Sequence, residues 1–147
     1  MNYEERDTYG MYKATAGLTP GPATERGPGP HLMGADTLIG NDVYNRQEDD
    51  LGEIKEIMLD VHSGRVAYAV LSFGGFLGMG KKLFAVPWSA LTLDTEHKRF
   101  VLDIDKERLA SAPGFDKDHW PDMADPAWTQ SIHSYYRTKP YPDDPRH

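Results

Sequence analysis

Residues 75–81, with the sequence GFLGMGK, have the spacing G-x-x-x-x-G-K that places backbone amides around phosphates in nucleotide-binding proteins. That chemistry also needs a hydroxyl side chain after the lysine, to hold magnesium, and a helix N-terminus that faces the phosphates. Here Lys82 stands in the hydroxyl position, and residues 83–88 have the apolar pattern of a strand. The sequence therefore argues against nucleotide binding and predicts a hairpin loop at this position.

The histidines and carboxylates do not form a recognisable metal motif. No two histidines are spaced i, i+4, and the chain has no cysteine to supply a thiolate. His62 and His97 fall in predicted turns, where exposure to solvent explains them, and the acidic run at 48–50 lacks the spacing of a calcium loop. We expect no metal and no cofactor. The histidines are His31, His62, His97, His119, His133 and His147.

The chain also lacks the residues for nucleophilic catalysis. None of the serines lies in a G-x-S-x-G setting, and a cysteine nucleophile is excluded. We therefore expect a protein that is not an enzyme, with no catalytic residues.

The charge of the chain limits its partners. The net charge is −7, and residues 36–105 hold 12 acidic and 7 basic residues. Nucleic acids and anionic membranes are bound through clustered Lys and Arg, so both are unexpected partners. No apolar run approaches the roughly 20 residues that span a bilayer, and the N-terminus is acidic where a signal peptide would be basic. We expect a cytoplasmic protein without membrane insertion.

Composition divides the chain into three parts. Residues 1–34 are rich in proline and glycine and have few apolar residues, which is typical of a flexible tail. Residues 35–105 contain only one of the eleven prolines and are expected to form a sheet. Residues 106–147 form a C-terminal extension with a helix near 126–137, because Asp125-Pro126 is a typical helix start. Trp128, Ile132 and Tyr135 would share one face of that helix.

Six apolar segments predict six strands, at 38–44, 51–61, 65–73, 83–88, 91–93 and 100–104. Short strands joined by tight turns favour a mainly β fold, a small six-stranded antiparallel barrel. Ile54 is out of phase with Ile57, so we expect a β-bulge near Lys55-Glu56 that returns it to the core side. The predicted core consists of Ile39, Val43, Ile57, Leu59, Val61, Ala69, Leu71, Val86, Leu91, Phe100, Leu102 and Ile104.

The segment 65–73 is apolar on both faces, but the interior of a small barrel takes only one of them. The other face, which carries either Tyr68 or Leu71, must be covered by the helical stripe of the C-terminal extension or by a second subunit. Apolar residues on the neighbouring loop would extend the same patch. This pattern predicts a homodimer built on the barrel surface.

Several motifs in order along the chain resemble those of the PRC-barrel domain family. They are DTLIG at 36–40, GEIKEIMLD at 52–60, GRVAYAV at 64–70, FGGFLG at 73–78 and AVPW at 85–88. The family includes the cytoplasmic domain of the photosynthetic reaction centre H subunit and the C-terminal domain of a ribosome maturation factor. This chain resembles the stand-alone bacterial type. The resemblance implies a six-stranded barrel used for protein contacts, and it supplies no catalytic residues.

The leading hypothesis is a non-enzymatic interaction module that binds itself, as a homodimer, and an unknown protein partner. A small-ligand or metal-binding accessory protein is the alternative, and a factor associated with ribosomes or RNA is a third. The residues expected to contact a partner are Tyr68, Phe76, Leu77, Met79 and Trp88.

Overall fold

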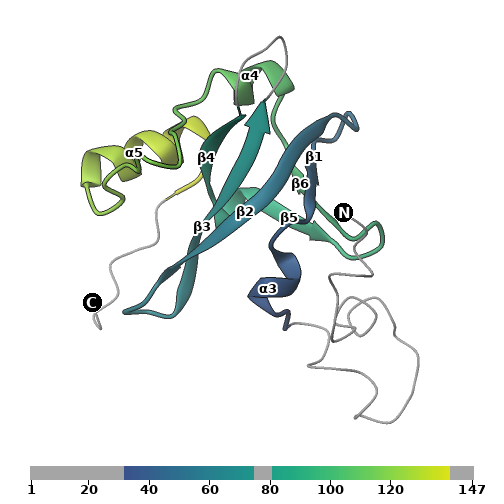
Figure 1. Ribbon diagram of the computed structural model, residues 1–147, viewed down its shortest axis with the longest axis horizontal. Helices are drawn as coiled ribbons and strands as arrows, with labels where there is room; N and C mark the ends of the chain where they lie inside the picture. The colour runs from purple at the N-terminus through teal and green to yellow at the C-terminus, as the bar shows by residue number, and fades with distance from the viewer. Residues whose placement is uncertain (1–31, 75–80, 140–147) are drawn as a thin grey trace.

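The computed structural model describes residues 32–74 and 81–139 (Figure 1). The expected N-terminal tail and the loop residues Phe76, Leu77 and Met79 therefore lie almost wholly outside the described residues. The elements, in chain order, are α3 (Ala35–Leu38), β1 (Asp42–Tyr44), β2 (Asp50–Asp60), β3 (Arg65–Gly74), β4 (Lys81–Pro87), η2 (Trp88–Ala90), β5 (Leu91–Asp94), β6 (Arg99–Leu102), α4 (Lys106–Ala110) and α5 (Pro126–Tyr135).

The strands form one curled six-stranded sheet in the order β4-β3-β2-β1-β6-β5. Four of its five pairings are antiparallel, but β1 and β6 run parallel, with Val43 opposite Phe100. The expectation of a purely antiparallel barrel is therefore wrong at this pairing. No tight turn joins two strands that are far apart in the chain, so local sequence carries no signal for their direction. In Figure 1, α4 lies at one end of the sheet and α3 near the other.

The first predicted strand, 38–44, is shorter than expected. Residues Ala35–Leu38 form α3 instead, and the chain turns at Gly40, whose φ is +91°. The Gly40 amide donates a hydrogen bond to the Ile54 carbonyl at 2.6 Å. This turn carries the chain from the buried side chain of Leu38 into β1, which keeps only Asp42–Tyr44.

Of the twelve residues predicted to form the core, seven are buried, three are partly buried, and the two at the outer end of β2 are exposed. Leu59 is 54% exposed and Val61 is 85% exposed, so placing them in the core is wrong. The bulge expected near Lys55-Glu56 is present and Ile54 is buried, but a second irregularity follows between Met58 and Leu59. Beyond it the β2–β3 hairpin projects past the other strands (Figure 1), so its tip has no core to face. The predicted residues that are buried are Val43, Ala69, Leu71, Val86, Phe100, Leu102 and Ile104; Ile39, Ile57 and Leu91 are partly buried.

Gly52 lies in β2, between β1 and β3 in the sheet, just before Glu53, which pairs with both neighbours. Its φ is +100°, a conformation that favours glycine, and its amide donates to the Asp50 carboxylate at 2.8 Å. A Cβ at this position would lie 2.1 Å from the Ser72 carbonyl oxygen. The close approach of β2 and β3 therefore depends on the missing side chain.

Asn45 fixes the turn that follows β1. Its side-chain oxygen, Oδ1, accepts from the Gln47 and Asp49 backbone amides at 3.0 and 2.8 Å. Its amide nitrogen donates to the Asp49 carboxylate at 3.0 Å and to the Ile104 carbonyl at 3.1 Å. One buried polar side chain thus ties the β1–β2 turn to the chain just after β6, and its hydrogen-bonding groups are used.

Candidate interaction surface

The helix α5 covers Tyr68 on the outer face of β3 and also lies against β4. Tyr68 is buried there, and its ring meets Trp128 edge-to-face, with 5.3 Å between the ring centroids. Burial raises the pKa of Tyr68. This arrangement follows from the two apolar faces of β3, because the inner face carries Ala69 and Leu71 into the core. Of the two expected covers, the structure shows the helical stripe of the C-terminal extension.

The C-terminal extension is also held by α4. The Arg108 guanidinium lies over the Tyr135 ring, 4.4 Å from its centroid, and donates to the Tyr135 carbonyl at 2.7 Å. The Tyr135 hydroxyl donates to the Arg108 carbonyl in return. Earlier in the extension, Phe115 exchanges two backbone hydrogen bonds with Leu83, at 2.8 and 2.9 Å, along the outer edge of β4.

The other expected contact residues are placed as follows. Trp88 lies in η2, is partly buried, and packs edge-to-face on Phe100 at 5.6 Å between ring centroids. Its ring therefore packs against the core. Phe76, Leu77 and Met79 lie outside the described residues. Of the two described residues in the expected set, Tyr68 faces α5 and Trp88 faces Phe100, and the structure does not bring them into one exposed patch.

The tip of the β2–β3 hairpin is the most exposed apolar feature of the sheet. It carries Leu59 and Val61, which we call the hairpin-tip pair. The turn is well defined, because the Asp60 carboxylate accepts from the His62 amide at 2.9 Å and Gly64 has a φ of +79°. Alternation alone had assigned both residues to the core. The sequence carries no signal for their exposure, because it follows from the structural lengths of the strands: β2 has 11 residues whereas β1 has 3.

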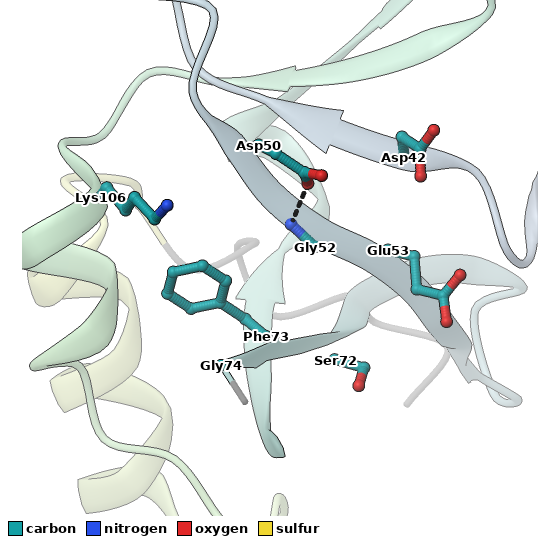
Figure 2. Close-up of a pocket in the computed structure, with 8 residues that line it drawn as sticks. All are labelled: Asp42, Asp50, Gly52, Glu53, Ser72, Phe73, Gly74 and Lys106. Atoms are coloured by element: carbon teal, nitrogen blue, oxygen red, sulfur yellow. Dashed lines mark hydrogen bonds between the residues drawn. The ribbon is translucent and has the colours of Figure 1, made fainter. Parts of the chain in front are cut away.

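A cavity of about 300 Å³ opens between the first residues of β2 and the last residues of β3. Figure 2 shows that Asp42 and Glu53 lie on one side of it and Lys106 on the other, with Phe73 between them. The Asp50 carboxylate is turned onto the Gly52 amide (Figure 2). The acidic side chains are spread around the rim and do not converge on one point, so they do not form a ready cation site.

A wider groove of about 670 Å³ lies on the outer face of the sheet, next to residues 116–120. Val70 and Leu83 form its apolar floor, and Trp120, 44% exposed, lines its rim. The indole N–H of Trp120 donates to the Lys117 carbonyl at 2.9 Å, and its ring packs on Phe115. The remaining rim is a mixture of acidic and basic side chains, which gives no net preference for an anion or a cation.

Within residues 32–74 and 81–139, one group of carboxylates and histidine comes close enough to hold a metal ion: Asp94, Glu96 and His97 in the β5–β6 turn. The Asp94 carboxylate already accepts from the amides of both other residues at 3.1 Å and from the His97 imidazole at 2.7 Å. Partial burial raises the pKa of Asp94, but the hydrogen bonds from His97 outweigh it and the net pKa is lowered. These contacts describe a turn closed by its own aspartate.

No helix in the described part of the chain is long and apolar enough to cross a membrane. A search of curated proteins finds no match. The family model of the PRC-barrel domain matches residues 30–109, which is more than half of the chain and spans the whole curled sheet together with α3 and most of α4. The chain belongs to the PRC-barrel family.

Proposed function

We propose that this protein is a non-enzymatic interaction module that binds a protein partner through the hairpin-tip pair, Leu59 and Val61. Family membership supports a protein-interaction role in general. The observation that carries the specific proposal is the exposure of two apolar side chains, at 54% and 85%, on a hairpin that projects from the sheet. Apolar side chains held together on an ordered projection favour burial against another surface.

The size of this feature sets the kind of contact. A stable interface buries about 800 Å² on each partner, and two side chains supply only part of that area. The hairpin-tip pair therefore serves as the anchor of a small or transient interface, with neighbouring polar residues such as Asp60 and His62 at its rim.

The proposed partners are a second copy of the chain and an unidentified protein. Since α5 covers Tyr68 on the outer face of β3, a homodimer would use a surface other than the one that carries this residue. The hairpin-tip pair supplies such a surface, and two copies could meet there about a two-fold axis. A ribosomal or RNA role has less support, because the sheet-forming part of the chain is acidic.

The experiment is an affinity capture from the native host with three baits: the wild-type chain, a Leu59→Glu/Val61→Glu variant, and a Thr92→Glu/Gln130→Glu variant. The last two carry the same added charge, but Thr92 and Gln130 are exposed on β5 and α5, away from the tip. We expect a specific partner to be captured by the wild type and the control, and lost with the tip variant. Equal capture by all three baits would contradict the proposed surface. Dominant recovery of ribosomal proteins would favour the third hypothesis.

A further inference from the structure

The helix α5 rests on the sheet through a buried histidine. His133 is 5% exposed, and its Nε2 atom lies 3.5 Å from the Tyr68 hydroxyl of β3. Its Nδ1 atom lies 2.8 Å from the Thr138 hydroxyl, just beyond the end of the helix. The imidazole therefore stands between the helix and the sheet, at a place where an apolar side chain would be ordinary.

The groups around this imidazole are hydroxyls. On the β3 side it meets Tyr68, which itself interacts with Thr129 of α5, and on the helix side it meets Thr138. Burial lowers the pKa of His133. Arg137 follows α5 in the chain, and Arg108 of α4 contacts Tyr135, two residues after His133. Within residues 32–74 and 81–139, the contacts of the imidazole include no acidic side chain.

We propose that His133 is a pH-sensitive latch, and that its protonation releases α5 from the outer face of β3 and β4. A neutral imidazole fits the contact, because one ring nitrogen can donate to a hydroxyl while the other accepts. An imidazolium has two donors and a charge that must leave water, and no carboxylate among its contacts in residues 32–74 and 81–139 compensates it. Protonation therefore weakens the docking of α5 rather than the sheet, since β3 keeps its hydrogen-bonded pairings with β2 and β4.

The direction of the pH dependence follows from linkage. Because the folded-state pKa of His133 lies below that of the free side chain, the released state binds the proton more tightly. The contribution of this contact to docking is complete above the ordinary histidine pKa of about 6.5 and is lost as the pH falls below it. For each unit by which docking lowers the pKa, the docking equilibrium weakens by up to about tenfold at low pH.

Release of α5 would uncover an apolar strip that is now hidden. Tyr68 lies on this face of β3, opposite Pro87 of β4, where it contacts Trp128 and His133 of α5. Trp128 and Ile132 of α5 would be uncovered at the same time. The proposed role of His133 does not depend on the hairpin-tip pair. It can therefore be supported or refuted whatever that surface binds.

The test is hydrogen–deuterium exchange of the full chain between pH 7.5 and about pH 5, a lower limit chosen because carboxylates titrate below it. Protection factors, which correct for the pH dependence of intrinsic exchange, are compared for amides of α5 and of β3. We expect the protection of α5 to fall severalfold or more as the pH falls, while that of β3 is kept. In His133→Gln, which stays neutral, the protection of α5 should not depend on pH; His119→Gln, at an exposed position, should behave as the wild type.

Three outcomes would overturn the proposal: constant protection of α5 in the wild type, an equal pH-dependent loss in His133→Gln, or a loss shared equally by β3. If His133→Gln does not fold, an NMR titration of the wild type replaces it. A His133 pKa at or above about 6.5 would then refute the latch. A lower pKa, with α5 resonances shifting at the same midpoint, would support it.

Discussion

Two glycines of β2 and its hairpin illustrate how much a single missing side chain matters. Gly52 and Gly64 both have positive φ, +100° and +79°, so both relieve backbone strain that an L-residue would meet. They differ in their surroundings. A Cβ at Gly52 would meet the Ser72 carbonyl at 2.1 Å, whereas a Cβ at Gly64 would meet nothing within 4 Å.

We therefore predict that Gly52→Ala costs about 3 kcal/mol or more, because the strands must separate as well as accept the strained φ. Gly64→Ala should cost about 1–2 kcal/mol, the cost of the left-handed conformation alone. Urea unfolding of both variants measures the difference. Equal losses would show that the contact with Ser72 does not limit the approach of β2 and β3.

At the level of elements, α5 begins as its sequence indicates. Asp125 is the N-cap, and its carboxylate accepts from the Ala127 amide at 2.9 Å, with Pro126 in the first turn. A helix of 10 residues is too short to be stable alone, so its cap and its docking on β3 act together.

Removing the cap should weaken α5 and leave the sheet intact. We predict that Asp125→Ala lowers the stability of α5 by about 1 kcal/mol, since the first turn loses an acceptor. Asp125→Ser keeps an acceptor and should lose much less. Amide exchange within α5 reports the change, and an unaltered rate in Asp125→Ala would mean that the cap is not used in solution.

The burial of side chains on the strands gives a second prediction at the level of elements. Leu102 in β6 is 2% exposed, so Leu102→Ala should cost about 2–5 kcal/mol of unfolding free energy. Leu59→Ala at the hairpin tip should change it by less than about 0.5 kcal/mol. Ile57, which is only partly buried, should lie between them. The midpoints of denaturant unfolding check this order. A large loss of unfolding free energy in Leu59→Ala would show that Leu59 belongs to the core.

The strand β2 shows which features could be predicted from the sequence and which could not. The bulge at Lys55-Glu56 could be predicted, because Ile54 and Ile57 cannot otherwise face the same core. The exposure of Leu59 and Val61 could not, since it depends on where the other strands end. The parallel pairing of β1 with β6 was missed because it joins segments far apart in the chain. The helix at Ala35–Leu38 was missed because four residues are too few to show a helical period. The predicted loop contacts at Phe76, Leu77 and Met79 stay predictions.

For the molecule as a whole, the net charge of −7 and the small apolar tip act in opposite directions on self-association. Two copies repel each other at low ionic strength, and salt screens this repulsion over a Debye length of about 10 Å at 0.1 M. The apolar contact itself is nearly independent of salt.

We therefore predict a weak dimer that is favoured by salt. Sedimentation equilibrium should show an average mass that rises with protein concentration, and more steeply at high ionic strength. Val61→Glu should stay monomeric over the same range, while Thr92→Glu should follow the wild type. A wild-type mass that remains at one chain under all conditions would rule out the homodimer.

The parallel pairing of β1 and β6 also determines how the sheet would carry a mechanical load. The chain enters at the start of β1 and leaves at the end of β6, and these two points lie at opposite ends of a pair of neighbouring strands. A pull on the two ends would therefore slide β1 along β6 and load their hydrogen bonds together. An antiparallel pair at the same place would open like a zipper, one bond after another. If this domain is tethered at both ends, the β1–β6 seam is the part of the sheet that resists the tension first.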